Sequence, residues 1–427
     1  MAKPRVLIIA EAANPDWVSV PLIGWSLSRA LRDVADVHVV TQVRNREAIL
    51  RAGWIEGQDF TAIDSEAVAR RLWKIGDVLK MGDGKGWTAL QAVAALSYYD
   101  FERRVWRQFA PDLRAGRYDL VHRITPLSPT TPSTLAARCR RIGVPFVLGP
   151  LNGGVPWPPS FEAERRRERE WLSYLRSAYR LLPGRAGMLK SAAAIIAGSR
   201  HTASEIPARF QDKLVYLPEN GIDPQRFTGT SQAGHDKVAA CFVGRLVPYK
   251  GPDMLLEAAA PLLRDGRMTL DIVGDGPMMP KLRTMAEDLG DAVRFHGWLA
   301  HQNVQTVMKS CNLLSFPSIR EFGGGVVLEA MALGIVPLIV DYAGPGELVD
   351  DTVGRKVPIG TRDDIIAGFR QELARIAEDP SVLAPLAAAA KSRVEADFIW
   401  PRKAAQITEI YRWALGETAH KPDFFPR

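Results

Sequence analysis

The sequence is poor in cysteine. Its 427 residues include only Cys139, Cys241 and Cys311, which lie far apart and form no C-x-x-C pair. An odd number of widely spaced cysteines argues against both a disulfide framework and a zinc site. The pattern fits a reducing compartment, so we expect a cytoplasmic protein.

Long hydrophobic runs are also missing. No apolar stretch approaches the roughly 20 residues that a helix needs to span a bilayer. The apolar run Val6–Ala10 is too short for a signal peptide and ends at Glu11, so it predicts a buried first strand. The sequence has no short internal repeat and no low-complexity tract.

What remains is an ordinary globular composition, with 47% hydrophobic and 24% charged residues. A chain of 427 residues predicts two domains of roughly 200 residues each. The formal charge of +7 favours anionic partners without choosing among nucleotides, nucleic acid and a membrane surface.

Short apolar runs alternate with amphipathic stretches along most of the chain. This alternation predicts α/β domains with parallel sheets covered by helices. The predicted strands are Val6–Ala10, Val37–Thr41, Leu120–His122, Phe146–Leu148 and Ala194–Ala197 in the first half, and Ala239–Val243, Leu270–Val273, Val293–Phe295, Leu313–Phe316 and Val336–Val340 in the second.

A polar stretch rich in turn-forming residues, 223–236, predicts a linker between the two series of strands. We expect a first domain over residues 1–222 and a second over 237–399. Both would be doubly wound, with ligands bound beyond the carboxyl ends of the strands in a cleft between the domains. Within 43–105, helical patterns cover Ala67–Leu79 and part of Ala89–Phe109.

The strongest motif runs from Ser315 to Gly334. A strand ends, Glu321 and Phe322 follow, and three glycines, Gly323–Gly325, precede a helix that contains Glu329. Backbone N–H groups at such a helix start favour a phosphate, whereas carboxylates accept hydrogen bonds from hydroxyls. A phosphate between two polyols, as in a nucleotide sugar, matches this pattern.

Two further loops follow predicted strands. The first loop begins with Gly244-Arg245 and ends with Lys250-Gly251, so its two cations are five residues apart. Two cations in one glycine-bounded loop suit a diphosphate. Gly274 opens Gly-Asp-Gly-Pro, which lacks the third glycine of a dinucleotide-binding fingerprint. This glycine either approaches the ligand or only makes a tight turn.

Together these motifs resemble the donor domain of the family 4 retaining glycosyltransferases, which have the GT-B fold of two Rossmann-like domains. The family's E-x7-E motif matches Glu321 and Glu329, and its Gly-Arg-x4-Lys-Gly element matches the loop from Gly244 to Gly251. Further similar stretches are Pro218–Asp223 with Phe227, Phe295–Leu299, and Asp397–Trp400 with a C-terminal helix that would return to the first domain, over about 400–427.

The resemblance implies a role for each matched residue. Arg245 and Lys250 would neutralise the donor diphosphate, and Glu321 would hold hydroxyls of the transferred sugar with support from the Gly323–Gly325 amides. Glu329 would hold the ribose. His122, which ends a strand of the first domain, would face the donor sugar; its alternative is a core histidine with satisfied hydrogen bonds.

The family implies a hexosyltransferase-type enzyme without a metal or other cofactor. Its partners would be a nucleotide-sugar donor and a glycan or lipid-linked acceptor in polysaccharide or glycoconjugate synthesis, and no nucleic acid. The alternative is a nucleotide-sugar epimerase or a binding module on the same fold.

The sequence departs from the family at two loops. Residues 14–21, in the first strand–helix loop, have no glycine pair, and Asn14 or Ser19 would have to substitute. After the strand Val336–Val340, Ala343 stands where the family has the first glycine of Gly-Gly-x-x-Glu.

Residues 161–190 carry eight Lys/Arg and four Asp/Glu, or +4 of the chain's +7. An aromatic stripe at helical spacing within them predicts either reversible binding to an anionic membrane surface or packing on the first domain.

Overall fold

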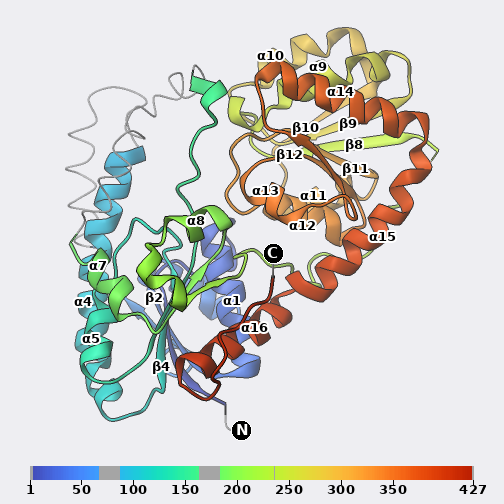
Figure 1. Ribbon diagram of the computed structural model, residues 1–427. Coiled ribbons are helices and arrows are strands. Elements are labelled where there is room, and N and C mark those ends of the chain that lie inside the picture. The colour runs from blue at the N-terminus through green and yellow to red at the C-terminus, as the bar shows by residue number, and fades with distance from the viewer. Residues whose placement is uncertain (1–2, 67–86, 163–182, 235, 426–427) are drawn as a thin grey trace. The chain divides into compact units, whose positions relative to one another are not determined.

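The computed structural model describes residues 3–66, 87–162, 183–234 and 236–425 (Figure 1). The helix expected over Ala67–Leu79 lies outside these residues. So does the part of 161–190 that carries the aromatic stripe, within 163–182. The described chain forms two compact units, each built on one parallel sheet. The first unit runs to Gly154, takes in 183 to Glu219 and ends with the chain from Trp400. The second contains residues 155–162 and Asn220–Ile399.

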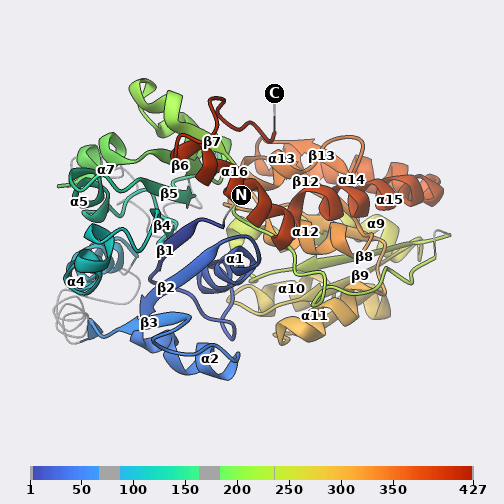
Figure 2. The same ribbon diagram turned by 90° about the horizontal axis from the view of Figure 1, so that it is seen from below.

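The first sheet has the strand order β3-β2-β1-β4-β5-β6-β7, so the order reverses direction between β1 and β4 (Figure 2). Its strands are β1 (Arg5–Ala10), β2 (Asp36–Gln42), β3 (Phe60–Ile63), β4 (Leu120–Thr125), β5 (Phe146–Leu151), β6 (Ala194–Ala197) and β7 (Leu214–Tyr216).

Helices cover both faces of this sheet because successive strand residues point to opposite sides. Val6 and Ile8 pack with α1 (Val20–Val34) and α16 (Trp400–Ala414), whereas Leu7 and Ile9 pack with α4 (Trp87–Arg114) and α5 (Leu135–Arg141). Figure 2 shows α1 and α16 beside each other. The other helices of this unit are α2 (Arg46–Arg51), α7 (Arg185–Ser191) and α8 (Arg200–Glu205).

The second sheet has the order β10-β9-β8-β11-β12-β13. Its strands are β8 (Val238–Val243), β9 (Met268–Val273), β10 (Val293–Gly297), β11 (Leu313–Phe316), β12 (Val336–Asp341) and β13 (Arg355–Pro358). The helices are α9 (Pro252–Arg264), α10 (Met279–Met285), α11 (His301–Met308), α12 (Gly325–Ala332), α13 (Ala343–Leu348), α14 (Arg362–Glu378) and α15 (Leu383–Arg393). α14 begins with a capping box in which Thr361 and Asp364 bond each other's backbone N–H groups.

The structure confirms all ten predicted strands and the two-sheet α/β architecture. Among the described residues, the sequence missed the strands β3, β7 and β13, and each of them lies at an edge of its sheet. The predicted first domain, residues 1–222, included residues 155–162, because they stand between β5 and β6 in the sequence. The structure groups them with the second unit.

Candidate donor site

The three motif loops of the second unit lie at one edge of its sheet. They follow the neighbouring strands β9, β8 and β11, whose carboxyl ends meet there because the strands are parallel. The Gly274 loop lies directly on the Gly244 loop, where a Cβ on Gly274 would overlap the Gly244 carbonyl oxygen. The Leu246 N–H donates to the Asp275 carbonyl at 3.0 Å. The geometry therefore gives Gly274 a packing role, supporting the loop that carries Arg245 and Lys250.

Lys250 and Glu321 form an ion pair, although 71 residues separate them. Their side chains are 16% and 21% exposed, so both are largely removed from water. Burial and the nearby Arg245 lower the pKa of Lys250 to about 8. Arg245 itself is exposed. The structure thus brings together Lys250 and Glu321, and leaves Arg245 accessible at the same edge.

The glycine run shapes the start of α12. Gly324 takes the left-handed φ of 63° immediately before Gly325, the first helical residue. The Gly344 N–H donates to the Glu321 carbonyl at 3.3 Å, and a Cβ on Gly344 would overlap the Phe322 carbonyl oxygen. The α13 turn therefore supports the backbone of Glu321 and Phe322. Ala343 holds this turn with a φ of 53°, a conformation that normally favours glycine.

Glu329 is held by residues that the sequence analysis did not select. Its carboxylate accepts from His301 Nε2 at 2.8 Å, and Arg226 Nη2 lies 3.3 Å from His301 Nδ1. A guanidinium can only donate, so Nδ1 is the acceptor and Nε2 carries the proton that Glu329 receives. The Phe227 ring packs edge-on against His301, with 5.4 Å between centroids. Phe227 was part of the family resemblance and was the one available signal for this contact.

His122 lies in the first unit and is fully buried. Its Nε2 donates to the Gly149 carbonyl and its Nδ1 accepts from the Tyr411 hydroxyl, each at 2.6 Å. Burial lowers the pKa of His122 to about 4, so the ring is neutral. Both ring nitrogens are therefore used inside the unit, which matches the core-histidine alternative rather than a donor-facing side chain.

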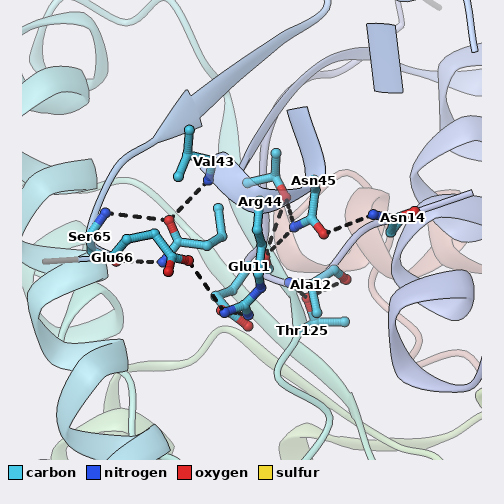
Figure 3. Close-up of polar contacts among 11 residues, drawn as sticks. Glu11, Ala12, Asn14, Val43, Arg44, Asn45, Ser65, Glu66 and Thr125 are labelled. Atoms are coloured by element: carbon cyan, nitrogen blue, oxygen red, sulfur yellow. Dashed lines mark hydrogen bonds and ion pairs between the residues drawn. The ribbon is translucent and has the colours of Figure 1, made fainter. Parts of the chain in front are cut away.

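A polar cluster lies at the carboxyl edge of the first sheet, beside the reversal between β1 and β4 (Figure 3). Glu11, just after β1, accepts from Arg44, and burial raises the pKa of the Glu11 carboxyl. Asn45 donates to the Glu11 carbonyl at 2.9 Å, and Asn14 donates to Asn45 at 3.4 Å. Ligands of doubly wound sheets bind at such reversals. Of these residues, only Asn14 was predicted from the sequence as a candidate for ligand contact.

No group of three or more His, Cys, Asp or Glu side chains could hold a metal ion among the residues that the structure describes. Within the same residues, no helix combines the length and apolar character that crossing a membrane requires.

The fold is that of known GT-B glycosyltransferases. The chain superposes on the Anabaena protein HepE, solved with UDP and glucose, with a TM-score of 0.61 and 18% identity over 96% of this chain and 99% of that one. It superposes on sucrose-phosphate synthase from Thermosynechococcus elongatus with a TM-score of 0.60 and 16% identity over 97% and 100% of the chains.

Sequence comparison finds similar proteins over part of the chain. Residues 226–391 match the model of glycosyl transferases group 1. The D-inositol 3-phosphate glycosyltransferase of Saccharomonospora viridis is 32% identical over 46% of this chain and 49% of its own. The alpha-D-kanosaminyltransferase of Streptomyces kanamyceticus is 28% identical over 49% and 56%. The chain thus spans about half the length of these curated relatives, and its similarity to the group 1 glycosyl transferases is carried by residues 226–391.

Proposed function

We propose that the protein is a retaining, family 4 glycosyltransferase of the hexosyltransferase type. It would move a sugar from a nucleotide-sugar donor to a glycan or lipid-linked acceptor in polysaccharide or glycoconjugate synthesis. The observation that carries the proposal is the Lys250–Glu321 ion pair beside the glycine-led start of α12. A cation for phosphate, a carboxylate for hydroxyls and backbone N–H groups stand together at one sheet edge.

Donor binding would rearrange the charges of this site. Lys250 and Arg245 would turn to the diphosphate and stabilise the charge that develops on the leaving group. Glu321 would then be free to accept hydrogen bonds from sugar hydroxyls, with support from the N–H groups of Gly323–Gly325. Glu329, oriented by His301, would accept from the ribose. We propose no protein nucleophile, no metal and no other cofactor.

The acceptor would bind at the carboxyl edge of the first sheet. Support comes from the strand reversal between β1 and β4 and from the polar cluster around Glu11 and Arg44. The cytoplasm remains the proposed location, with peripheral binding to the inner face of a membrane through 161–190, a segment mostly outside the described residues.

The deciding experiment has two stages. Purified protein is first screened for thermal stabilisation by UDP-, GDP- and ADP-sugars, because a ligand that binds the folded state raises the melting temperature. Release of nucleoside diphosphate is then followed with and without candidate glycan acceptors. A transferase releases it when the acceptor is added. Conversion of the sugar without any release would identify an epimerase, and stabilisation without turnover a binding module.

A further inference from the structure

A short segment from the first half of the sequence packs on the donor-site loops. Val155, Trp157 and Phe161 are buried within the second unit, although they follow β5 of the first sheet in sequence. The Tyr342 hydroxyl donates to the Pro156 carbonyl at 2.9 Å and fixes this segment beside the end of β12. We refer to residues 155–161 as the strap.

Trp157 lies against both donor-site loops. Its ring meets the Tyr249 ring edge-on, with centroids 6.1 Å apart, and the Arg320 guanidinium carbon lies 5.0 Å from its ring centroid. Tyr249 immediately precedes Lys250, and Arg320 immediately precedes Glu321. The Ile319 N–H also donates to the Tyr249 carbonyl at 3.0 Å. This bond joins the two loops at Tyr249, the residue whose ring Trp157 contacts.

Arg320 connects the strap to the glycine run as well. Its guanidinium carbon lies 5.8 Å from the Phe322 ring centroid, so both the Trp157 ring and the Phe322 ring neighbour this side chain. Arg320 and Phe322 stand on either side of Glu321 in sequence. Stacking on aromatic rings restricts the rotation of a guanidinium. Trp157 therefore restrains Arg320, the residue immediately before Glu321, and with it the backbone of Glu321.

We propose that Trp157 is a positioning residue for the donor diphosphate and the transferred sugar. By packing on Tyr249 and Arg320 it fixes the distance between the loops that carry Lys250 and Glu321, so both side chains face one ligand. This inference rests on the proposed function. It adds to the donor site a residue that lies outside the matched family region, 226–391.

The inference is tested by a double-mutant cycle on nucleoside diphosphate affinity, measured by calorimetry with UDP, GDP and ADP. Trp157→Ala should weaken the best of the three about tenfold, and Trp157→Phe, which keeps a ring against Arg320, should recover most of that loss. In a Lys250→Ala background the Trp157→Ala effect should shrink below about threefold, because coupled residues are not additive.

Phe161→Ala is the matched control, since Phe161 is a buried aromatic residue of the same strap. It should lower the melting temperature as Trp157→Ala does and leave the affinity of the folded protein within about twofold. An equal affinity loss in Phe161→Ala, or an unchanged Trp157→Ala effect in the Lys250→Ala background, would overturn the inference while the proposed function stands. If the wild-type protein binds none of the three diphosphates, the proposed function fails and the inference fails with it.

Discussion

The carboxyl edges of the two sheets use polar residues differently. At the carboxyl edge of the second sheet, the proposed donor edge, Lys250 and Glu321 form an ion pair that the proposed donor would open, next to an exposed Arg245 and a glycine-led helix start. At the first edge, Glu11, Arg44, Asn45 and Asn14 bond mainly to one another and to backbone. The donor edge shows chemistry that demands fixed residue types. The first edge holds its polar groups in a network joined across separate loops, and its sequence carries no comparable motif.

The largest expected effect tests the charges of the donor edge. Arg245→Ala and Lys250→Ala should each lower kcat/KM for the donor by about tenfold to a hundredfold, because a hydrogen bond to a charged group contributes about 1.5–3 kcal/mol. Steady-state kinetics would measure this.

Lys281→Ala is the control for these two variants. It removes a cation of the same domain whose partner is Asp253. Near-normal donor kinetics in both Arg245→Ala and Lys250→Ala would contradict the diphosphate assignment.

The two glutamates of the donor edge should separate turnover from nucleotide binding. Glu321→Gln should lower kcat about tenfold or more and keep the nucleoside diphosphate affinity within about twofold, because the proposed partner of its carboxylate is the sugar rather than the nucleotide. Glu329→Ala should weaken the bare nucleotide about tenfold, and His301→Ala should cause a smaller loss in the same direction. Calorimetry with nucleoside diphosphate measures these affinities; the opposite pattern would exchange the two roles.

The buried histidine of the first unit gives a sharp contrast with these donor-edge variants. His122→Ala removes a ring that bonds Tyr411 and Gly149, and leaving buried polar groups unpaired costs about 1–3 kcal/mol each. We expect a clearly lower melting temperature and donor KM within about threefold of wild type. A large loss of turnover at unchanged melting temperature would restore the donor-facing role.

Donor affinity should depend on pH through Lys250. Its pKa of about 8 means that the free protein loses this charge above pH 8, so the donor Kd should rise there by up to about tenfold per pH unit. Lys250→Arg keeps its charge and should remove the rise; a rise that persists in this variant would assign the titration to another group. In the absence of donor, the effect of Lys250 on stability has the opposite sign. An unfolded lysine titrates near 10.5, so between about pH 8 and 10.5 the unfolded chain binds more protons than the folded protein. The contribution of this group to the free energy of unfolding therefore rises with pH in that range.

The smallest effect concerns backbone strain, which both edges share. Ser19 and Ala343 have φ values of 64° and 53° in the loops where the family has glycines. Ala343→Gly should raise the free energy of unfolding by up to about 1 kcal/mol, because relief of about 1–2 kcal/mol of strain exceeds the entropic cost of glycine.

Ala367→Gly is the matched control for this substitution, because Ala367 is an exposed residue inside α14, where glycine in place of alanine costs about 1 kcal/mol. Chemical denaturation measures both variants. Destabilisation of Ala343→Gly to the same extent would show that the turn is not strained.

The sequence by itself determined the central strands of both sheets and the edge strand β10, together with the positions of the loops proposed to bind the donor. A central strand is buried on both faces, so it appears as a continuous apolar run such as Val6–Ala10. The loops of the proposed donor site are local patterns as well. One loop contains Arg245 and Lys250, and another contains Glu321 and the glycines. Each set needs a fixed spacing within its loop to contact one ligand.

Only the tertiary structure decided the rest, because it depends on residues brought together from distant parts of the chain. His122 meets Tyr411 from 289 positions away, and His301 reaches Glu329 from another element. The edge strands β3, β7 and β13 are short and gain their order from a neighbouring strand rather than from their own pattern. Trp157 follows a strand of the first sheet and packs on the second unit, and no local periodicity carries that information.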